Sequence, residues 1–316
     1  MSDLLRSGKD SRRDTSMTRR ETTPASPGES ASPEQSARAA GIGQPRFPVP
    51  PKATDSHHHV YDARYPVDPS SLLQPPDATV ADYGALQRKL GIERHVVVQP
   101  STYGTDNRCL LDALSRFGSA ARGIATVPVT ITDSELAGLH HMGIRGLRFN
   151  LEYLVGVTVS MMAPLSKRIE PLGWHIQVNA TAAQLLAHQQ LLASLSSPLV
   201  IDHMGQVPQP GGAEHAAFRM IEALLARGRS WVKLSGPYLA SQSGAPVYAD
   251  AGMVARRFAE LAPDRTLWGS DWPHPTQAPG NKPDAALLLD DLTLWIPDAS
   301  ARHRILVENP ARLYSF

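Results

Sequence analysis

The chain is poor in cysteine, in long apolar runs and in excess charge. Cys109 is the only cysteine among 316 residues, which excludes an internal disulfide and a cysteine-rich zinc site. No run approaches the roughly 18 consecutive apolar residues that a membrane helix needs. The 31 basic residues nearly balance the 30 acidic ones, so nothing in the charge favours nucleic acid as a partner. We therefore expect a cytoplasmic protein without a membrane partner.

The first 46 residues differ in composition from the rest. They contain no aromatic residue and few aliphatic ones, so they cannot bury enough apolar surface to offset the entropy lost on ordering. Arginine pairs at 12–13 and 19–20 invite comparison with a twin-arginine export signal, but no apolar segment follows either pair. We predict a disordered tail over residues 1–46 and a folded domain over residues 47–316.

In the folded part, strand-like apolar runs alternate with segments of helical periodicity. Alternating strands and helices imply a parallel sheet, and eight such units fit the (β/α)8 TIM barrel. An open doubly wound sheet is the alternative, but no glycine-rich phosphate-binding turn follows an early strand. The predicted strands are 54–60, 94–99, 123–128, 144–150, 174–180, 199–203, 231–235 and 266–271. The predicted helices are 80–90, 107–117, 134–142, 182–195, 213–226, 251–261 and 299–307.

Three consecutive histidines lie on the first predicted strand. Because side chains alternate between the two faces of a strand, His57 and His59 share one face and His58 points to the other. Two imidazoles on a buried face need a polar partner, such as a metal, a substrate oxygen or a carboxylate. We predict that His57 and His59 face a functional site and that His58 is structural.

A TIM barrel carries its active site at the carboxyl ends of its strands, and several predicted strands end on polar residues. His203 on its own could be a structural histidine, and Arg148 could be a surface salt-bridge partner. Lys233 could point inward or pair with an acid. We predict catalytic roles for His57, His59, His203 and Asp271, and substrate-binding roles for Ser101, Tyr103, Arg148, Asn150, Tyr238 and His274.

Five motifs together resemble the amidohydrolase superfamily, in its amidohydrolase-2 branch. They are residues 55–59, 146–150, 202–205, 268–274 and 308–313, and the resemblance spans about residues 54–316. Within this branch the chain is most similar to enzymes that process lactones. The resemblance implies a TIM-barrel hydrolase that opens the ester bond of a small anionic lactone.

The chain departs from the metal-dependent members of this family at one important position. Those members usually have a histidine at the end of the fifth strand, where this chain has Gln177 or Asn179. No lysine suited to carboxylation ends the fourth strand, so we do not expect a binuclear centre. The resemblance leaves open a single divalent metal, zinc or manganese, on His57, His59 and Asp271, and it also leaves open catalysis without a metal.

The requirements of ester hydrolysis suggest a mechanism, and the resemblance bears on the substrate. Related dicarboxylate lactonases bind their substrate with several arginines, and only Arg148 has a match here, which favours a lactone with one anionic group. Asp271 would deprotonate the attacking water, with a pKa that burial raises. The histidines would polarise the carbonyl, directly or through a metal. A lactone isomerase, a metal-dependent nonoxidative decarboxylase and a noncatalytic binding protein remain alternatives.

Overall fold

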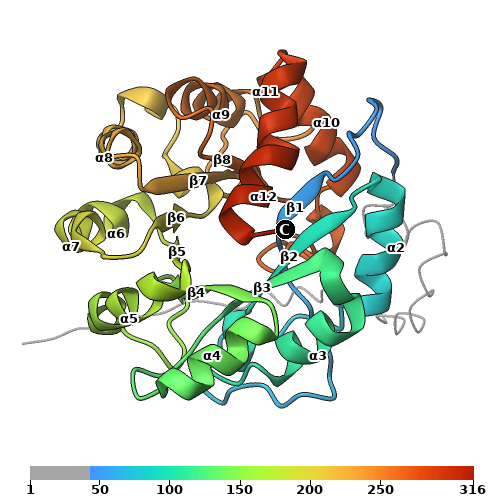
Figure 1. The fold of residues 1–316 in the computed structure, drawn as a ribbon. Helices are drawn as coiled ribbons and strands as arrows, with labels where there is room; N and C mark the ends of the chain where they lie inside the picture. Colours follow the sequence, from blue (N-terminus) through green and yellow to red (C-terminus); the bar gives the residue numbers. More distant parts are fainter. Residues whose placement is uncertain (1–42) are drawn as a thin grey trace, which may run out of the picture.

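The computed structural model describes residues 43–316, and their strands form a barrel (Figure 1). Eight parallel strands in this part of the chain follow one another in the order β1 to β8. The predicted TIM-barrel fold is confirmed. The strands are β1 Thr54–His58, β2 Arg94–Val98, β3 Ala121–Ala125, β4 Ile144–Asn150, β5 His175–Asn179, β6 Leu199–Ile201, β7 Ser230–Leu234 and β8 Thr266–Trp268.

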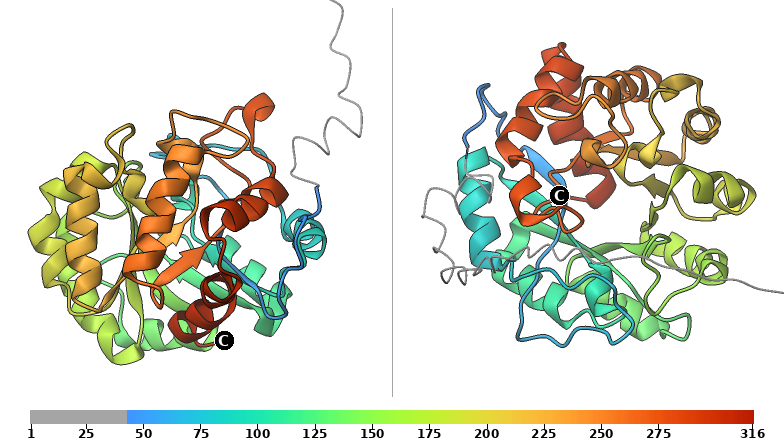
Figure 2. Two further views of the ribbon diagram at one scale, coloured as in Figure 1. Left: turned by 90° about the horizontal axis from the view of Figure 1, so that it is seen from above. Right: turned by 180° about the vertical axis from the view of Figure 1, so that it is seen from behind.

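Helices surround the strands, as the side and rear views in Figure 2 show. They are α2 Val80–Leu90, α3 Arg108–Phe117, α4 Asp133–His141, α5 Met162–Ile169, α6 Ala182–Ala187, α7 Gln189–Ser194, α8 Ala216–Ala226, α9 Ala249–Leu261, α10 Ala285–Trp295, α11 Ala299–His303 and α12 Asn309–Tyr314. A turn of π-helix, Arg304–Glu308, joins the last two. Helices α2, α4 and α6 begin with capping boxes headed by Thr79, Thr132 and Thr181, in which a threonine and the residue three positions later exchange side-chain-to-backbone hydrogen bonds.

Most predicted elements agree with the structure within a few residues, but some helices differ. The predicted helix 182–195 is interrupted at His188, which separates α6 from α7. The predicted helix 299–307 consists of α11 and the turn of π-helix that follows it. Helices α5, α10 and α12 were not predicted. Proline at position 164 in α5 hid the helical pattern, and α10 is so rich in leucine that its apolar residues form no clear stripe.

The barrel closes between its first strand and the segment that follows its last strand. The backbone N–H of Asp271 donates to the carbonyl of His57 at 2.8 Å, and the N–H of His59 donates to the carbonyl of Trp272 at 2.8 Å. Asp55 strengthens this junction, because its carboxylate accepts hydrogen bonds from the backbone N–H and the hydroxyl of Ser270 at 2.9 and 2.5 Å. The junction therefore brings the two sequence motifs of β1 and β8 side by side.

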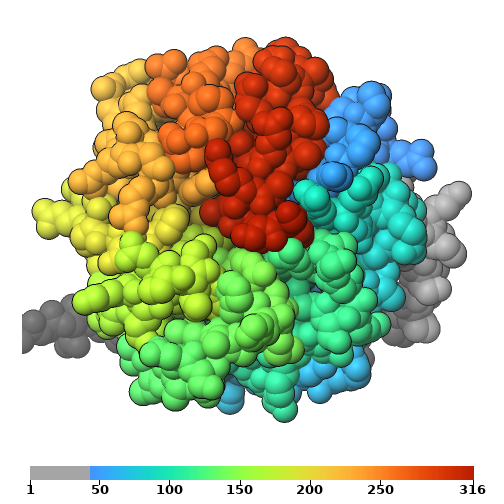
Figure 3. Space-filling model, viewed as in Figure 1, coloured from blue at the N-terminus to red at the C-terminus, as the bar shows by residue number. Residues whose placement is uncertain are grey.

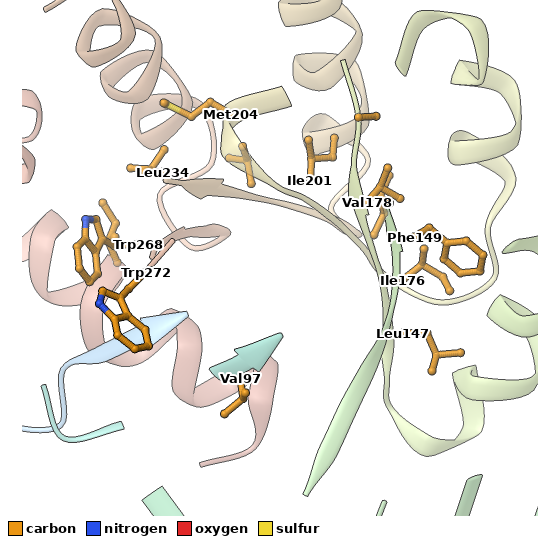
Figure 4. Packing of buried hydrophobic residues seen from close by; sticks show 14 of the residues in the cluster. Val97, Leu147, Phe149, Ile176, Val178, Ile201, Met204, Leu234, Trp268 and Trp272 are labelled. Carbon is orange, nitrogen blue, oxygen red and sulfur yellow. The ribbon is translucent and has the colours of Figure 1, made fainter. Parts of the chain in front are cut away.

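Two apolar layers pack against the barrel wall. The outer layer lies between the strands and the helices, and Figure 4 shows members such as Val97, Phe149 and Val178. The inner layer contains Val96, Val200 and Leu267, which pack with Leu313 and Tyr314 of the C-terminal helix. That helix lies across the amino ends of the strands, in the middle of the face seen in Figure 3. With this end closed, access from solvent is left to the carboxyl ends.

Most of the predicted disordered tail, residues 1–42 of 1–46, lies outside the described residues. Residues 43–46 are described, and the backbone N–H of Arg46 donates to the carboxylate of Asp290 at 2.7 Å. Within residues 43–316, no helix is long and apolar enough to cross a membrane.

Candidate active site

The first strand directs two of its three histidines into the barrel. His57 and His59 are both buried, and the Nε2 atom of each lies 3.6 Å from Oδ1 of Asp271. His58 points to the opposite face, where its ring stacks on Tyr83 at 3.5 Å between centroids and hydrogen-bonds His95. The alternation predicted from the sequence therefore holds over His57–His59, although the pairing with β2 shifts register between Asp55 and His58.

Asp271 is the point on which three imidazoles converge. Its Oδ1 also lies 3.9 Å from Nε2 of His203, whose Nδ1 hydrogen-bonds the hydroxyl of Ser235 at 2.9 Å. Asp271 and His203 both have positive φ angles, 58° and 53°, in a region that non-glycine residues rarely adopt. Such strain is retained where the surrounding structure holds it in place, often at functional sites. Both residues thus follow their strands in sharp turns that direct their side chains to one point.

The pKa of Asp271 differs from the sequence-based expectation. Burial alone would raise this pKa, as expected for a dry barrel mouth. The neighbouring imidazoles of His203, His59 and His57 outweigh burial, and the pKa of Asp271 falls below its ordinary value. The expectation of a raised pKa is therefore wrong, because it considered burial and left out three nearby groups that favour the charged carboxylate.

Tyr238 and His274 extend the site on the other side of Asp271. The hydroxyl of Tyr238 donates to Oδ2 of Asp271 at 2.5 Å and lies 3.2 Å from Nδ1 of His274. Burial and the nearby Asp271 raise the pKa of Tyr238, so the phenol stays a hydrogen-bond donor. His274 does not line the cavity; it lies behind Tyr238, and burial lowers its pKa to about 4. Because the single phenol proton goes to Asp271, a neutral His274 can hold Tyr238 by donating from Nδ1 to the phenol oxygen.

A buried charged network lies beneath the histidines. The ammonium of Lys233 lies 3.3 Å from Oδ1 of Asp202 and donates to Oε1 of Gln177 at 2.7 Å. Both Lys233 Nζ and Asp202 Oδ1 lie 3.2 Å from Nδ1 of His57. Lys233 thus points inward and also pairs with an acid, which were the two possibilities that the sequence left open. Asp202 and Gln177 had no predicted role, and their position at the carboxyl ends of β6 and β5 was the available signal.

The cavity above this floor has a volume of about 240 Å³. Among the predicted substrate-binding residues, Ser101, Arg148, Asn150 and Tyr238 line it. Arg148 is 6% exposed and donates to the carbonyl of Gln99 at 2.7 Å. Its Nε has no hydrogen-bond partner, and no carboxylate among the described residues forms an ion pair with it. Arg148 is therefore a buried guanidinium beside the cavity rather than a surface salt-bridge partner.

Tyr103, like His274, is a predicted binding residue that does not line the cavity. It belongs to a 3₁₀ turn, Ser101–Tyr103, and its hydroxyl accepts from the N–H of Asp62 at 2.8 Å and donates to the Asp62 carbonyl at 3.2 Å. Both hydrogen-bonding capacities of the phenol are thus used by the backbone. The sequence prediction of a ligand contact at Tyr103 does not agree with this geometry, because the turn directs the ring away from the cavity.

One charged residue of the cavity was missed by the sequence analysis. Glu152 follows β4 and lines the cavity together with Asn179 and Gln206. Its Oε1 accepts hydrogen bonds from the amide of Asn179 at 3.1 Å and from the amide of Gln206. The signal in the sequence was its spacing: Glu152 lies four residues after Arg148, so it falls on the same face if the strand continues.

The histidines and Asp271 could hold a single metal ion. One ligand atom each from His57, His203 and Asp271 lie within 4.8 Å of one another. His57 Nε2 is buried without a hydrogen-bond partner. His59 Nδ1 must carry its proton, because its partner at 2.8 Å is the carbonyl of Val98; burial lowers the pKa of His59, which leaves an Nε2 lone pair facing the Asp271 carboxylate.

An imidazole lone pair and a carboxylate oxygen attract each other only through a proton or a cation between them, so this donor set favours a shared proton or a bound cation. Two imidazoles and a carboxylate suit zinc, and a carboxylate-containing set also suits manganese. The candidate metal ligands in the structure are His57, His203 and Asp271, so His203 takes the place of His59 in the predicted set. His59 borders this group through its 3.6 Å approach to Asp271.

The fold and the site define an amidohydrolase-type barrel, and comparison with known families agrees. The chain matches the family model described as Amidohydrolase over residues 54–316. The chain belongs to this family.

Its relatives include a 2-pyrone-4,6-dicarboxylate hydrolase of Comamonas testosteroni, 37% identical over 87% of this chain and 94% of the relative. A 4-sulfomuconolactone hydrolase of Rhizobium radiobacter is 36% identical over 88% of this chain and 94% of the relative. A D-galactarolactone isomerase of Agrobacterium fabrum is 31% identical over 85% of this chain and 93% of the relative. A solved structure of a probable 2-pyrone-4,6-dicarboxylic acid hydrolase from Acinetobacter baumannii, with citric acid bound, superposes with a TM-score of 0.75 at 28% identity, covering 84% of this chain and all of that one.

Proposed function

We propose that this protein is a hydrolase that opens the ester bond of a small anionic lactone. The single observation that carries this function is the convergence of Asp271 and three imidazoles at the bottom of a cavity whose wall contains the unpaired guanidinium of Arg148. Ester hydrolysis needs a proton acceptor for water and a polar partner for the carbonyl oxygen, and an anionic substrate needs a cation. Relatives at 31–37% identity are named for reactions of lactones.

In the proposed reaction, Asp271 accepts the proton of the attacking water while Arg148 holds the carboxylate or sulfonate of the lactone bidentately. His57, His59 and His203 face the same point and stabilise charge that develops on the carbonyl oxygen. Because the pKa of Asp271 is low, this carboxylate is ionised at neutral pH but is a weak base. It therefore needs a water whose own pKa is lowered in the site.

A divalent ion, when bound by His57, His203 and Asp271, would polarise the lactone carbonyl and lower the pKa of a nearby water. Side chains of the protein position the reacting groups. Tyr238 donates to the second oxygen of Asp271, which keeps Oδ1 directed at the three imidazoles. Lys233 and Asp202 hold His57 from below.

Lactone isomerisation is the second candidate function, because one relative is named as a lactone isomerase. The same residues could deprotonate a hydroxyl of the substrate in place of water, so that the ester bond moves without net hydrolysis. Net acid release separates the two reactions. The decarboxylase alternative has no support in the names of these relatives, and carbon dioxide release would test it. A cytoplasmic location stays a prediction from the sequence.

Proton release from anionic lactones, measured with a pH indicator, tests the proposed function. Wild type should release acid, and Asp271→Asn should fold normally and be inactive, because the amide cannot accept the proton. Near-normal kcat in this variant would exclude Asp271 as the base. Arg148→Met should raise KM more than it lowers kcat, whereas an arginine without a substrate contact would change neither. Product analysis by NMR then distinguishes an opened acid from an isomerised lactone.

A further inference from the structure

Two opposite charges lie in the cavity wall without ion-pair partners among the described residues. Arg148 lies on β4, and Glu152 follows the same strand two residues beyond its end at Asn150. Their side chains are not paired with each other; Arg148 donates to the carbonyl of Gln99, and Glu152 accepts from amides. The cavity is therefore electrically divided, with a cationic region at Arg148 and an anionic region at Glu152.

The two side-chain amides next to Glu152 have used their hydrogen-bond donors internally. The amide of Asn179 donates to Oδ1 of Asn150 at 2.9 Å and to Oε1 of Glu152 at 3.1 Å. The amide of Gln206 donates to Oε1 of Glu152 and to Oδ1 of Asn179 at 3.3 Å. An amide nitrogen has two protons to donate, so both amides are saturated. Among the described residues, Oε2 of Glu152 and Oε1 of Gln206 accept no hydrogen bond and remain for a ligand.

Because this part of the cavity wall presents free hydrogen-bond acceptors, it favours a ligand that has hydrogen-bond donors. A substrate hydroxyl can donate to Oε2 of Glu152, and such a bond to a charged acceptor is stronger than a neutral one. A carboxylate placed there would meet a like charge with no cation to compensate it, in a partly dry cavity where repulsion is weakly screened. Unpaired or repulsive groups of this kind are a common means of rejecting a related ligand.

We infer that the lactone of this enzyme carries one carboxylate, bound at Arg148, and at least one free hydroxyl, bound at Glu152, and that Glu152 selects against a second carboxylate. This inference rests on the proposed lactonase function and deepens it. Asn150 lies between the two charged residues, and its amide donates to the hydroxyl of Ser101 at 3.0 Å. In this proposal the polar face of β4 orients the lactone ring. Glu152 acts in specificity, because its hydrogen-bond partners are Asn179 and Gln206 and none of the groups that contact Asp271.

Three lactones test the inference: an aldaric acid monolactone, with one carboxylate and several hydroxyls; muconolactone, with one carboxylate and no hydroxyl; and 2-pyrone-4,6-dicarboxylate. For wild type we expect kcat/KM to be highest for the first and at least tenfold lower for the dicarboxylate. Glu152→Gln should reduce this ratio at least tenfold, mainly through KM, because it removes the repulsion and weakens the bond to the hydroxyl. Glu93→Gln, an exposed residue directly before β2, removes the same charge at the opposite end of the barrel and should leave the ratio unchanged.

Binding to Asp271→Asn, measured by calorimetry with the same three compounds, separates this inference from the proposed function. If wild type turns over the dicarboxylate as well as the monolactone, or if Glu152→Gln leaves the ratio unchanged, the inference is refuted and the lactonase function stands. If wild type hydrolyses none of the lactones but Asp271→Asn binds the hydroxylated one preferentially, the function is refuted and the ligand class stands. Absence of both turnover and binding refutes both.

Discussion

Replacement of Lys233 by methionine tests whether the charges beneath the site hold the catalytic geometry. At 3.3 Å, the attraction between the ammonium and Asp202 is about 5 kcal/mol for an effective dielectric constant of about 20. Both side chains are fully buried, so loss of the ammonium leaves an uncompensated carboxylate. Such a change typically costs about 3–5 kcal/mol in the free energy of unfolding. We expect Lys233→Met to lose that much, as measured by urea denaturation.

The double variant Lys233→Met/Asp202→Asn distinguishes the structural from the positioning role. Without the buried negative charge, we expect the double variant to recover about 2 kcal/mol of the loss. Its kcat should nonetheless stay about 10²-fold below wild type with little change in KM, because His57 loses the two groups that fix its Nδ1. Lys89→Met, at an exposed position in the last turn of α2, is the control. Activity that returns together with stability would refute a positioning role, and a stability loss below about 1 kcal/mol in the single variant would refute the buried pair.

Three further predictions follow from individual contacts. Tyr238→Phe removes the hydrogen bond of 2.5 Å between the phenol oxygen and Oδ2 of Asp271, and it should lower kcat about 10²-fold with little effect on KM. An effect on KM alone would contradict this prediction. In Gly269→Ala the new Cβ would lie 2.6 Å from Cβ of His57, so we expect about 1–3 kcal/mol lower stability and a parallel loss of kcat; unchanged kinetics would show that the strand absorbs the clash. Burial lowers the pKa of His95 from 6.5 to about 3. The neutral imidazole therefore contributes its full share of stability above pH 6.5. Between pH 6.5 and pH 3 only the unfolded chain takes up the proton, so the free energy of unfolding falls by up to about 1.4 kcal/mol for each unit by which the pH drops. His95→Gln should remove that slope from the unfolding free energy, and an unchanged slope would contradict the buried neutral imidazole.

The fold was predictable because its signal repeats along the chain. Each of the eight strands is a short buried run, and several intervening helices begin with a threonine that caps them. Helix α10 was missed because Ala285–Trp295 is apolar on most of its surface. Periodicity identifies a helix by the contrast between its faces, and this helix offers little contrast. Most of its side chains are buried, and it packs against α9 and α11, although Leu294 remains 53% exposed.

The site was predictable where strands determine it and less so where turns do. Strand alternation placed His57 and His59 correctly on one face and His58 on the other. The turn after β2 directed Tyr103 to the backbone of Asp62, and the bend after β4 brought Glu152 into the cavity. Backbone direction after a strand end depends on contacts between distant segments, which a single sequence does not reveal.

The arrangement of charges separates the residues that we propose for catalysis from those that we propose for specificity. Asp271, the imidazoles and the buried Lys233 lie on β1, β6, β7 and the segment after β8, whereas Arg148 and Glu152 lie on β4 and its extension. The two groups share a cavity but not a strand. A substitution at Glu152 can therefore change which substituent is accepted without moving the atoms that perform the hydrolysis. Turnover of every accepted lactone should then depend on Asp271, whereas the preference among lactones should depend on Glu152; a Glu152 variant that loses turnover of all lactones equally would contradict this separation.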